Sequence, residues 1–211
     1  MPWKFPKVYP ILDSARFPAE GRAEFLRKLG GELTQAGVTL LEYRNKTAID
    51  DLLLADAEIL RAAMPGVKLI LDDRAYLVDR CGFDGVHVDA GDVSPAEART
   101  LVGPDRIVGT FGGSDSLLPG ILDAPADYLA VGPVYLTTTK ETSKAPIGPE
   151  GVRHLRQQAG PDRTLTAAAG ITFETAPLVL AAGASAVAVA AALFAAPDPA
   201  AEFRRWLNAL G

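Results

Sequence analysis

The sequence predicts an α/β protein that forms a single (β/α)8 barrel, or TIM barrel, domain over residues 1–211. Eight short apolar runs, each suited to a buried parallel strand, alternate along the chain with segments of helical periodicity. The length of 211 residues lies near the lower limit of about 200 residues for such barrels. No GxGxxG or P-loop spacing follows the first strand. An open doubly wound sheet stays the alternative, because the pattern alone does not show that the strands close.

The first half of the chain contains four strand-then-helix units. Pro10 lies inside the first strand and removes one hydrogen-bond donor, so we expect weaker or bulged pairing there. A Pro65-Gly66 pair ends the second helix. Ser94, Pro95 and Glu97 form a capping-box start for the fourth helix. The expected elements are strands 8–12, 38–44, 68–71 and 84–88, helices 17–36, 49–64 and 76–80, and a helix that begins at Pro95.

The second half repeats the same alternation. The third and fifth helices are short in this interpretation, and a short turn precedes the terminal helix. The expected elements are strands 106–111, 128–134, 164–168 and 186–190, a short helix after Ser114, helices 152–158 and 173–182, the turn 191–194 and helix 199–210.

Composition excludes several classes of partner. The 21 basic and 26 acidic residues give a net charge of −5 and form no basic stripe, so we expect neither nucleic acid nor an anionic membrane as a partner. A single cysteine, Cys81, excludes an intramolecular disulfide and a cysteine-rich zinc site. Residues 1–10 lack the apolar core of a signal peptide, and the longest apolar stretch, 186–196, is too short to span a bilayer. We expect a cytoplasmic protein that binds small phosphorylated molecules.

A loop rich in hydroxyl groups and lysines follows the expected sixth strand. The stretch 127–148, DYLAVGPVYLTTTKETSKAPIG, begins as an apolar run and turns at Gly132-Pro133. Beyond the turn, Thr137 and Thr139 offer hydrogen-bond donors and Lys140 offers positive charge, so this stretch predicts an anion-binding loop. The alternative is a solvated surface loop whose threonines favour turns.

Charged residues follow three earlier strands. They are Glu42, Arg44 and Lys46 after the second strand, Asp72 and Asp73 after the third, and Asp89 and Asp92 after the fourth. Alternate residues of a strand share a face, so the first three should point the same way. Because the carboxyl ends of barrel strands meet at one rim, all seven should converge there.

This gathering of acids and cations predicts a site for a metal ion and phosphate. Clustered carboxylates are destabilising unless a divalent cation or an anion lies among the charges. Carboxylates with water and phosphate oxygens are the ligands that Mg²⁺ prefers, which makes Asp73 and Asp92 metal candidates. As alternatives, the two aspartates cap helices or form rim salt bridges, and Arg44 belongs to a structural ion pair.

The sequence offers no catalytic nucleophile. It has no Ser/His/Asp order, no cysteine near a base and no HExxH motif. His87 lies mid-strand and is interpreted as a barrel histidine with satisfied partners rather than as a catalyst. Small residues around Gly170 and Ala191, after the seventh and eighth strands, would let an anion approach the backbone, although they also suit plain packing.

Five motifs, in order and at the right spacing, resemble the thiamine phosphate synthase family. EYRNK at 42–46 is similar to the family's QxREK, LDDR at 71–74 to INDR, DGVHVDAGD at 84–92 to DGVHxGQxD, ADYLAVGPVYLTTTK at 126–140 to ADYxGxGPxxxTxTK, and AAGIT at 168–172 to IGGIT. The resemblance covers nearly the whole chain. It implies a (β/α)8 transferase that joins hydroxymethylpyrimidine diphosphate to thiazole phosphate and releases pyrophosphate with Mg²⁺.

The resemblance also implies a role for each matching residue. The implied pyrophosphate contacts are Arg44, Lys46 and Lys140, and the implied Mg²⁺ ligands are Asp73 and Asp92. The implied contacts of the thiazole phosphate are Thr137, Thr139, Gly170 and the turn at Ala191. Glu42 and Asp72 stand at positions that contact the pyrimidine. A homodimer is the assembly that we expect of such a barrel.

The chain departs from the family pattern mainly on the pyrimidine and pyrophosphate side. Glu42 stands for a glutamine, and an ionised carboxylate only accepts hydrogen bonds. The other departures are Asp72 for asparagine, Asp89-Ala90 for Gly-Gln, Phe111 and Gly113 for a serine and a histidine, and Ala191 for a serine. A non-catalytic or diverged phosphate-binding paralogue is therefore a second hypothesis. A lyase or isomerase of another phosphosugar is a third, against which stands the lack of a lysine in an apolar strand end.

Overall fold

The structure is a computed structural model that describes residues 4–18, 20–89, 91–113, 118–137 and 145–211. The described residues form a closed barrel of eight parallel strands, each paired with its sequence neighbours, and β1 closes the ring against β8. The strands are β1 (Val8–Asp13), β2 (Leu40–Arg44), β3 (Lys68–Asp72), β4 (Gly85–Val88), β5 (Ile107–Gly113), β6 (Tyr128–Val131), β7 (Thr164–Ala168) and β8 (Ala186–Val189). The predicted barrel is confirmed, and the open-sheet alternative is wrong.

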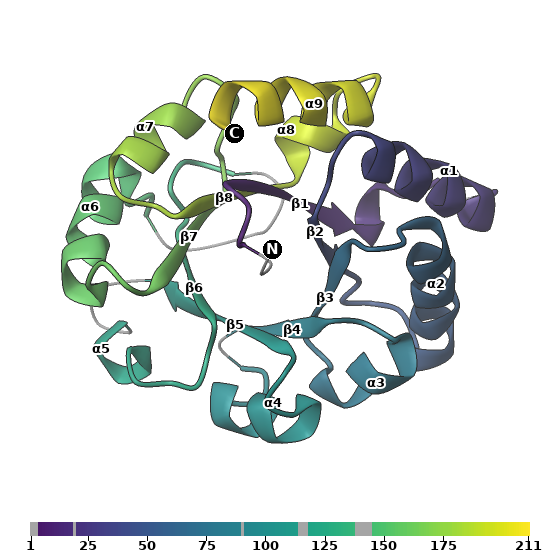
Figure 1. Ribbon diagram of the computed structural model, residues 1–211, viewed down its shortest axis with the longest axis horizontal. Helices are drawn as coiled ribbons and strands as arrows, with labels where there is room; N and C mark the ends of the chain where they lie inside the picture. The colour runs from purple at the N-terminus through teal and green to yellow at the C-terminus, as the bar shows by residue number, and fades with distance from the viewer. Residues whose placement is uncertain (1–3, 19, 90, 114–117, 138–144) are drawn as a thin grey trace.

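The helices form an outer ring around the strands (Figure 1). They are α1 (Arg22–Gln35), α2 (Asp50–Ala63), α3 (Val78–Cys81), α4 (Pro95–Val102), α5 (Leu118–Ile121), α6 (Gly148–Ala159), α7 (Ala176–Ala181), α8 (Ala191–Phe194) and α9 (Pro199–Leu210). Two 3-10 turns, η1 (Ser14–Arg16) and η2 (Ala75–Leu77), follow β1 and β3. No helix within these described ranges is long and apolar enough to cross a membrane.

Several element boundaries differ from the sequence prediction. The first helix begins at Arg22 instead of residue 17, because η1 and a left-handed Gly21 precede it. The sixth strand ends at Val131 instead of residue 134, since the chain turns at Gly132, where a Cβ would lie 2.4 Å from the carbonyl oxygen of Ala168. The expected capping box at Ser94 is present.

The pairing of β1 accommodates Pro10 without the bulge that we expected. Its residues from Val8 to Pro10 pair with β8, and its residues from Ile11 to Asp13 pair with β2. The proline therefore lies where the strand passes from one neighbour to the other. A register shift occurs instead between β5 and β6, at Phe111 and Gly113.

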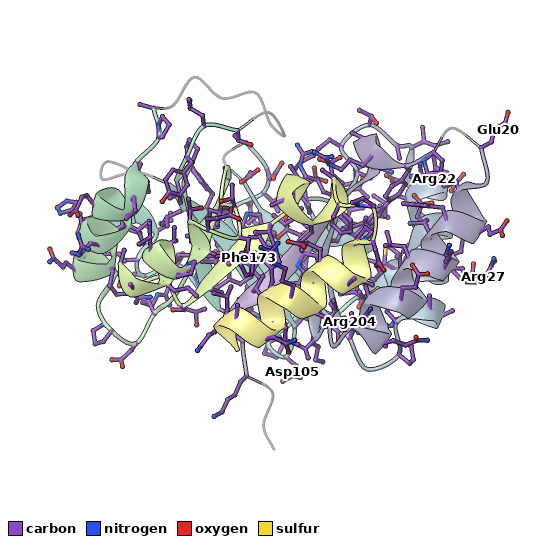
Figure 2. The ribbon with its side chains drawn as sticks, turned by 90° about the horizontal axis from the view of Figure 1, so that it is seen from above. Glu20, Arg22, Arg27, Asp105, Phe173 and Arg204 are labelled. Atoms are coloured by element: carbon purple, nitrogen blue, oxygen red, sulfur yellow. The ribbon has the colours of Figure 1, made fainter. Side chains whose placement is uncertain are left out.

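Two apolar layers hold the barrel. The larger lies between strands and helices and includes Trp206, which is fully buried. Phe173 lies beside α9 (Figure 2) and packs edge-on against Trp206 at 5.7 Å between ring centroids. The smaller cluster, with Tyr9 and Tyr128, fills the barrel interior. Gly109 makes room for it, since a Cβ there would lie 2.0 Å from Cζ of Tyr128.

Three arginines make the same set of hydrogen bonds at the amino-terminal ends of the strands. Each donates to carbonyl oxygens of the loop after its own helix and to a side chain just before an even-numbered strand. The pairs are Arg61 with Asp84, Arg99 with Asp127, and Arg156 with Ser185, and the three acceptors also accept the backbone N–H groups of Leu69, Val108 and Leu165. These hydrogen bonds connect neighbouring strands at the amino-terminal end of the barrel. The charged site residues lie at the opposite, carboxyl-terminal end.

Candidate active site

A cavity of about 650 Å³ opens at the carboxyl ends of the strands. Its volume lies within the range of small-molecule sites, roughly 300–1,000 Å³. The polar lining residues are Glu42, Arg44, Asp72, His87, Asp89, Thr137 and Thr172, and the larger apolar ones include Tyr9, Ile11, Phe111, Leu136 and Ile171. Small residues, among them Gly170 and Ala191, form the rest of the wall just after the ends of β7 and β8. The structure thus brings together most of the predicted site residues.

Arg44 joins two buried aspartates at the end of β2. Its Nε lies 3.0 Å from Oδ2 of Asp72, and its Nη1 donates to Asp13. The sequence alternative of a structural ion pair for Arg44 is confirmed, but the guanidinium also lines the cavity. Asp13, which ends β1, is the partner that sequence reasoning did not assign. Burial would lower the pKa of Arg44, but the charges of Asp72 and Asp13 outweigh it and keep the group charged.

The ammonium group of Lys46 lies among three aspartates. Its Nζ is 2.8 Å from Oδ1 of Asp72, 2.9 Å from Oδ2 of Asp73 and 3.9 Å from Oδ2 of Asp92. Burial would lower the pKa of Lys46, but the charge of Asp72 and the hydrogen bonds raise it above its usual value. Lys46 is therefore a fixed positive charge that holds the acids of three strand ends together.

Asp73 has a buried carboxylate oxygen, Oδ1, that accepts no hydrogen bond from the described residues, although Nε of Arg74 lies 3.6 Å from it. Its backbone is left-handed, with φ of 63°, and its N–H donates to the carbonyl of His87 at 2.8 Å. The Oδ1 atom has no hydrogen-bond donor among residues that the structure describes. Asp92 accepts from the backbone N–H of Asp89 at 2.8 Å. Neither aspartate caps a helix, since Arg74 and Ser94 hold the N-cap positions, so the capping alternative is wrong. The alternative of rim salt bridges is confirmed, because both aspartates pair with Lys46.

The carboxylates beside Lys46 form a donor set for Mg²⁺ that a phosphate ligand would complete. Within the described ranges, no three His, Cys, Asp or Glu residues are arranged to hold a metal ion. Mg²⁺, however, is usually held by one or two carboxylates together with water and substrate phosphate oxygens. The unsatisfied Oδ1 of Asp73 and the nearby carboxylate of Asp92 match that requirement. The residues present therefore fit the ion as part of a complex with phosphate.

Glu42 is a buried carboxyl group in the wall of the cavity. Its side chain comes from β2 and is 4% exposed. Burial raises its pKa to about 7, and the charges of Asp72 and Asp89 add to this while His87 and Lys46 oppose it. Burial also raises the pKa of Asp72, against the pull of Lys46. The carboxyl groups of this wall therefore differ from ordinary surface acids.

His87 is a cavity residue that sequence reasoning set aside. It has the partners expected of a barrel histidine: Nδ1 lies 3.0 Å from the hydroxyl of Tyr128, and Nε2 lies 3.6 Å from Oδ1 of Asp89. Burial would lower its pKa, but the hydrogen bond to Asp89 and the charges of Glu42 and Asp89 raise it to about 9. Strand alternation could have shown that His87 faces inward with Asp72, its register partner, because their neighbours are apolar.

The opposite side of the cavity is built from small residues and backbone. The loop after β6 packs on the turn after β7, where Tyr135 donates to the carbonyl of Ala169 at 3.1 Å. Gly170 has φ of 68°, and a Cβ there would lie 2.4 Å from the carbonyl oxygen of Leu136. This contact brings Thr137 and Gly170 to one wall, with Ala191 at the start of α8 beside them. The predicted residues Thr139 and Lys140 lie outside the described residues.

These features define a class of protein: a (β/α)8 barrel with cations, acids and small-residue turns around one cavity at its carboxyl rim. A family model described as thiamine monophosphate synthase matches residues 8–193. The chain belongs to that family.

Similar proteins carry related names. The chain is 40% identical over 207 residues to a thiamine-phosphate synthase of Koribacter versatilis, which covers 97% of each chain. It is 36% identical over 169 residues to a thiamine-phosphate synthase of Azorhizobium caulinodans, which covers 79% of each. A solved structure of thiamine phosphate pyrophosphorylase from Pyrococcus furiosus superposes with a TM-score of 0.76 at 24% identity, over 97% of this chain and 96% of that one. This last likeness supports the fold.

Proposed function

We propose that this chain is a transferase that joins hydroxymethylpyrimidine diphosphate to thiazole phosphate and releases pyrophosphate. The observation that carries the proposal is that one cavity joins a charged wall at β2, β3 and β4 to a small-residue wall at β7 and β8. Two phosphorylated substrates need two such regions within reach of each other. The names of the relatives in the family support the same activity.

Arg44 and Lys46 would bind the diphosphate of the first substrate. Both cations are already held by aspartates, so their positions are fixed before the substrate arrives. Lys140, outside the described residues, would supply a further charge from the loop after β6. These contacts favour departure of pyrophosphate because negative charge grows on it as its bond to the pyrimidinylmethyl carbon breaks.

Asp73 and Asp92 would hold Mg²⁺ against the same diphosphate. The bound ion would neutralise charge on the leaving group and so assist its departure. Asp73 offers its unsatisfied Oδ1 for this purpose, and Lys46 keeps the two carboxylates close to each other.

The second substrate would lie against Thr137, Gly170 and Ala191, with Thr139 from the same loop. Backbone groups can reach its phosphate there because the side chains are small. The carbon–oxygen bond of the pyrimidinylmethyl diphosphate breaks with its electron pair leaving on pyrophosphate, and the thiazole nitrogen forms the new carbon–nitrogen bond with its lone pair. No protein nucleophile is needed, and catalysis is electrostatic and positional.

A diverged paralogue that binds phosphate ligands without this reaction is the second candidate. Glu42, Asp72 and Asp89 favour it, because three acids beside a diphosphate oppose its binding when they are ionised. A cytoplasmic location and a homodimer stay predictions for either candidate.

Aspartate substitutions at the Mg²⁺ positions separate the two candidates. Asp73→Ala and Asp92→Ala should each reduce Mg²⁺-dependent product formation at least 100-fold if the chain is the transferase. Calorimetric binding of thiazole phosphate should persist, because its contacts lie on the other wall. Wild-type protein that binds thiazole phosphate but forms no product would support the paralogue instead. Asp105→Asn, at an exposed position, is the matched control.

A further inference from the structure

Four polar side chains connect the outer helices to the loop that carries Lys46. Arg22, the first residue of α1 (Figure 2), donates through Nε to Oδ1 of Asp56 on α2 at 2.8 Å. The hydroxyl of Tyr43 donates to the other carboxylate oxygen of Asp56. The side-chain amide of Asn45 donates in turn to the Tyr43 hydroxyl at 2.9 Å. These four residues, the Tyr43 network, therefore extend from α1 and α2 to the residue just before Lys46.

The Tyr43 network is buried in the layer between strands and helices. Tyr43 is fully buried there, and Asp56 and Asn45 are each 2% exposed. Buried amide and carboxylate groups are costly unless hydrogen bonds satisfy them. Here the tyrosine hydroxyl accepts from the amide and donates to the carboxylate, whose charge Arg22 balances. Because each group satisfies the next, the network favours one fixed arrangement of its side chains.

Asn45 transmits this fixed arrangement to the loop after β2. Its Nδ2 is bound to Tyr43, and its Oδ1 accepts the backbone N–H of Ala48 at 3.1 Å. An asparagine that bonds to the backbone in this way holds the turn between the two residues. Lys46 lies inside that turn, and its carbonyl oxygen also accepts from Arg74 at 3.4 Å. The backbone of Lys46 is therefore held by side chains of the outer layer and of the loop after β3.

Lys46 extends toward the cavity rim, whereas none of the four network residues lines the cavity. Its ammonium group lies 2.8 Å from Asp72 and 2.9 Å from Asp73. A lysine carries its charge on a flexible four-carbon chain, so the position of the charge depends on where the backbone begins that chain. A small shift of the loop would move the ammonium group away from these aspartates and from a bound anion.

We propose that the Tyr43 network positions the Lys46 ammonium group for the diphosphate of the first substrate, so that Tyr43 and Asn45 are positioning residues. The family's QxREK motif has glutamate where this chain has Asn45. An ionised carboxylate cannot donate to a hydroxyl, so the hydrogen bond to Tyr43 depends on the asparagine of EYRNK. The inference rests on the proposed function, because it takes Lys46 as a contact of the diphosphate.

A double-mutant cycle with inorganic pyrophosphate as the probe tests the proposal. Calorimetry in the presence of Mg²⁺ would measure the Kd of pyrophosphate for the wild type, Tyr43→Phe, Lys46→Met and the double variant. Tyr43→Phe removes one hydroxyl and keeps the buried ring. We expect it to raise the Kd about fivefold in the wild type and less than about twofold in Lys46→Met, because the network acts only through Lys46. The Kd of thiazole phosphate, which binds the opposite wall, should change less than about twofold in each variant.

Two further variants separate positioning from a loss of stability. Asn45→Ala keeps the hydrogen bond between Tyr43 and Asp56 but releases the loop, so it should raise the pyrophosphate Kd at least as much as Tyr43→Phe. The same cycle with Asn45→Ala decides the question if Tyr43→Phe does not fold, which circular dichroism would show. Thr34→Val is the control, because it removes a hydroxyl that donates to the carbonyl of Gly30 within α1 at 2.9 Å. It should leave both Kd values unchanged.

The outcomes separate this inference from the proposed function. The inference would be overturned by an equal fold-change in the pyrophosphate Kd with and without Lys46, or by an unchanged Kd in both Tyr43→Phe and Asn45→Ala. An equal change in the Kd of thiazole phosphate would overturn it as well, even if the protein forms product. The expected cycle without product formation would support the inference and contradict the proposed transferase. A wild-type protein that does not bind pyrophosphate with Mg²⁺ would overturn both.

Discussion

Lys46 lies between Asp72 and Asp73 and makes an ion pair with each, at 2.8 and 2.9 Å. The two aspartates are consecutive at the end of β3, and Asp73 has a left-handed backbone that turns its carboxylate toward the ammonium group. One lysine therefore balances charge that two acids bring into a largely buried space.

Replacement of Lys46 by Met should impair both stability and activity. The change removes the cation that Asp72 and Asp73 share and leaves Asp72 with Arg44 and Asp73 with the more distant Arg74, which should lower the free energy of unfolding by about 2 kcal/mol. The loss of a diphosphate contact should reduce kcat/KM at least 100-fold. Urea unfolding and a pyrophosphate-release assay measure the two effects. Lys28→Met is the control, because Lys28 makes only an exposed contact of 4.0 Å with Glu32 on α1. Wild-type turnover in Lys46→Met would exclude the assigned role.

Glu42 should make the stability of the protein depend on pH. Its folded pKa of about 7 is above its unfolded value near 4.5, so the stability it contributes is complete below pH 4.5 and is lost as the pH rises through 7. This difference corresponds to about 3 kcal/mol between the two pH limits. Glu42→Gln does not ionise, so its stability relative to the wild type should be greater at pH 8 than at pH 5. Unfolding curves at both pH values check this, and a pH-independent difference would show that Glu42 titrates normally.

Gly109 is required by the ring of Tyr128. A methyl group at residue 109 would lie 2.0 Å from Cζ of that ring, inside the closed barrel, where little space is free. Gly109→Ala should lower the free energy of unfolding by about 2–3 kcal/mol. It should also displace the hydroxyl that binds His87.

Gly31→Ala is a matched control for this substitution. Outside the neighbouring residues and backbone of α1 itself, nothing lies within 4 Å of the added Cβ, so the change should be neutral or slightly stabilising. Equal melting temperatures for Gly109→Ala and the wild type would contradict the packing of Tyr128 described above.

Arg156 should matter for stability and not for turnover. It donates to the carbonyls of Gly160, Arg163 and Gly183 at 2.7–2.8 Å, at the end of the barrel away from the cavity. Arg156→Ala leaves these groups without a charged donor and should cost about 2–3 kcal/mol of stability. Arg153→Ala, which removes an exposed pair with Glu150, should cost less than about 1 kcal/mol. A large fall in kcat for Arg156→Ala at a temperature where it stays folded would disagree with this assignment.

The sequence predicted the barrel because the buried strands are short apolar runs, and it predicted the rim because polar residues end those runs. The predicted start of α1 and end of β6 were less accurate, because the backbone turns at Gly21 and Gly132 there. Strand alternation correctly placed Glu42 and Arg44 on one face.

Other features of the site depend on contacts between distant segments, which strand patterns do not give. Asp13 of β1 accepts a hydrogen bond from Arg44 of the adjacent β2. The ring of His87 is held by a hydrogen bond with the hydroxyl of Tyr128, 41 residues further along the chain. The shift in the pKa of Glu42 likewise arises from burial and from acids on β3 and beyond β4. Sequence spacing alone does not reveal these partners.

The most direct test of the proposed activity is an assay of the purified protein with hydroxymethylpyrimidine diphosphate, thiazole phosphate and Mg²⁺, in which mass spectrometry detects the coupled product. We predict Mg²⁺-dependent formation of thiamine phosphate with one pyrophosphate released per product. The absence of product, while both substrates bind, would contradict the transferase assignment.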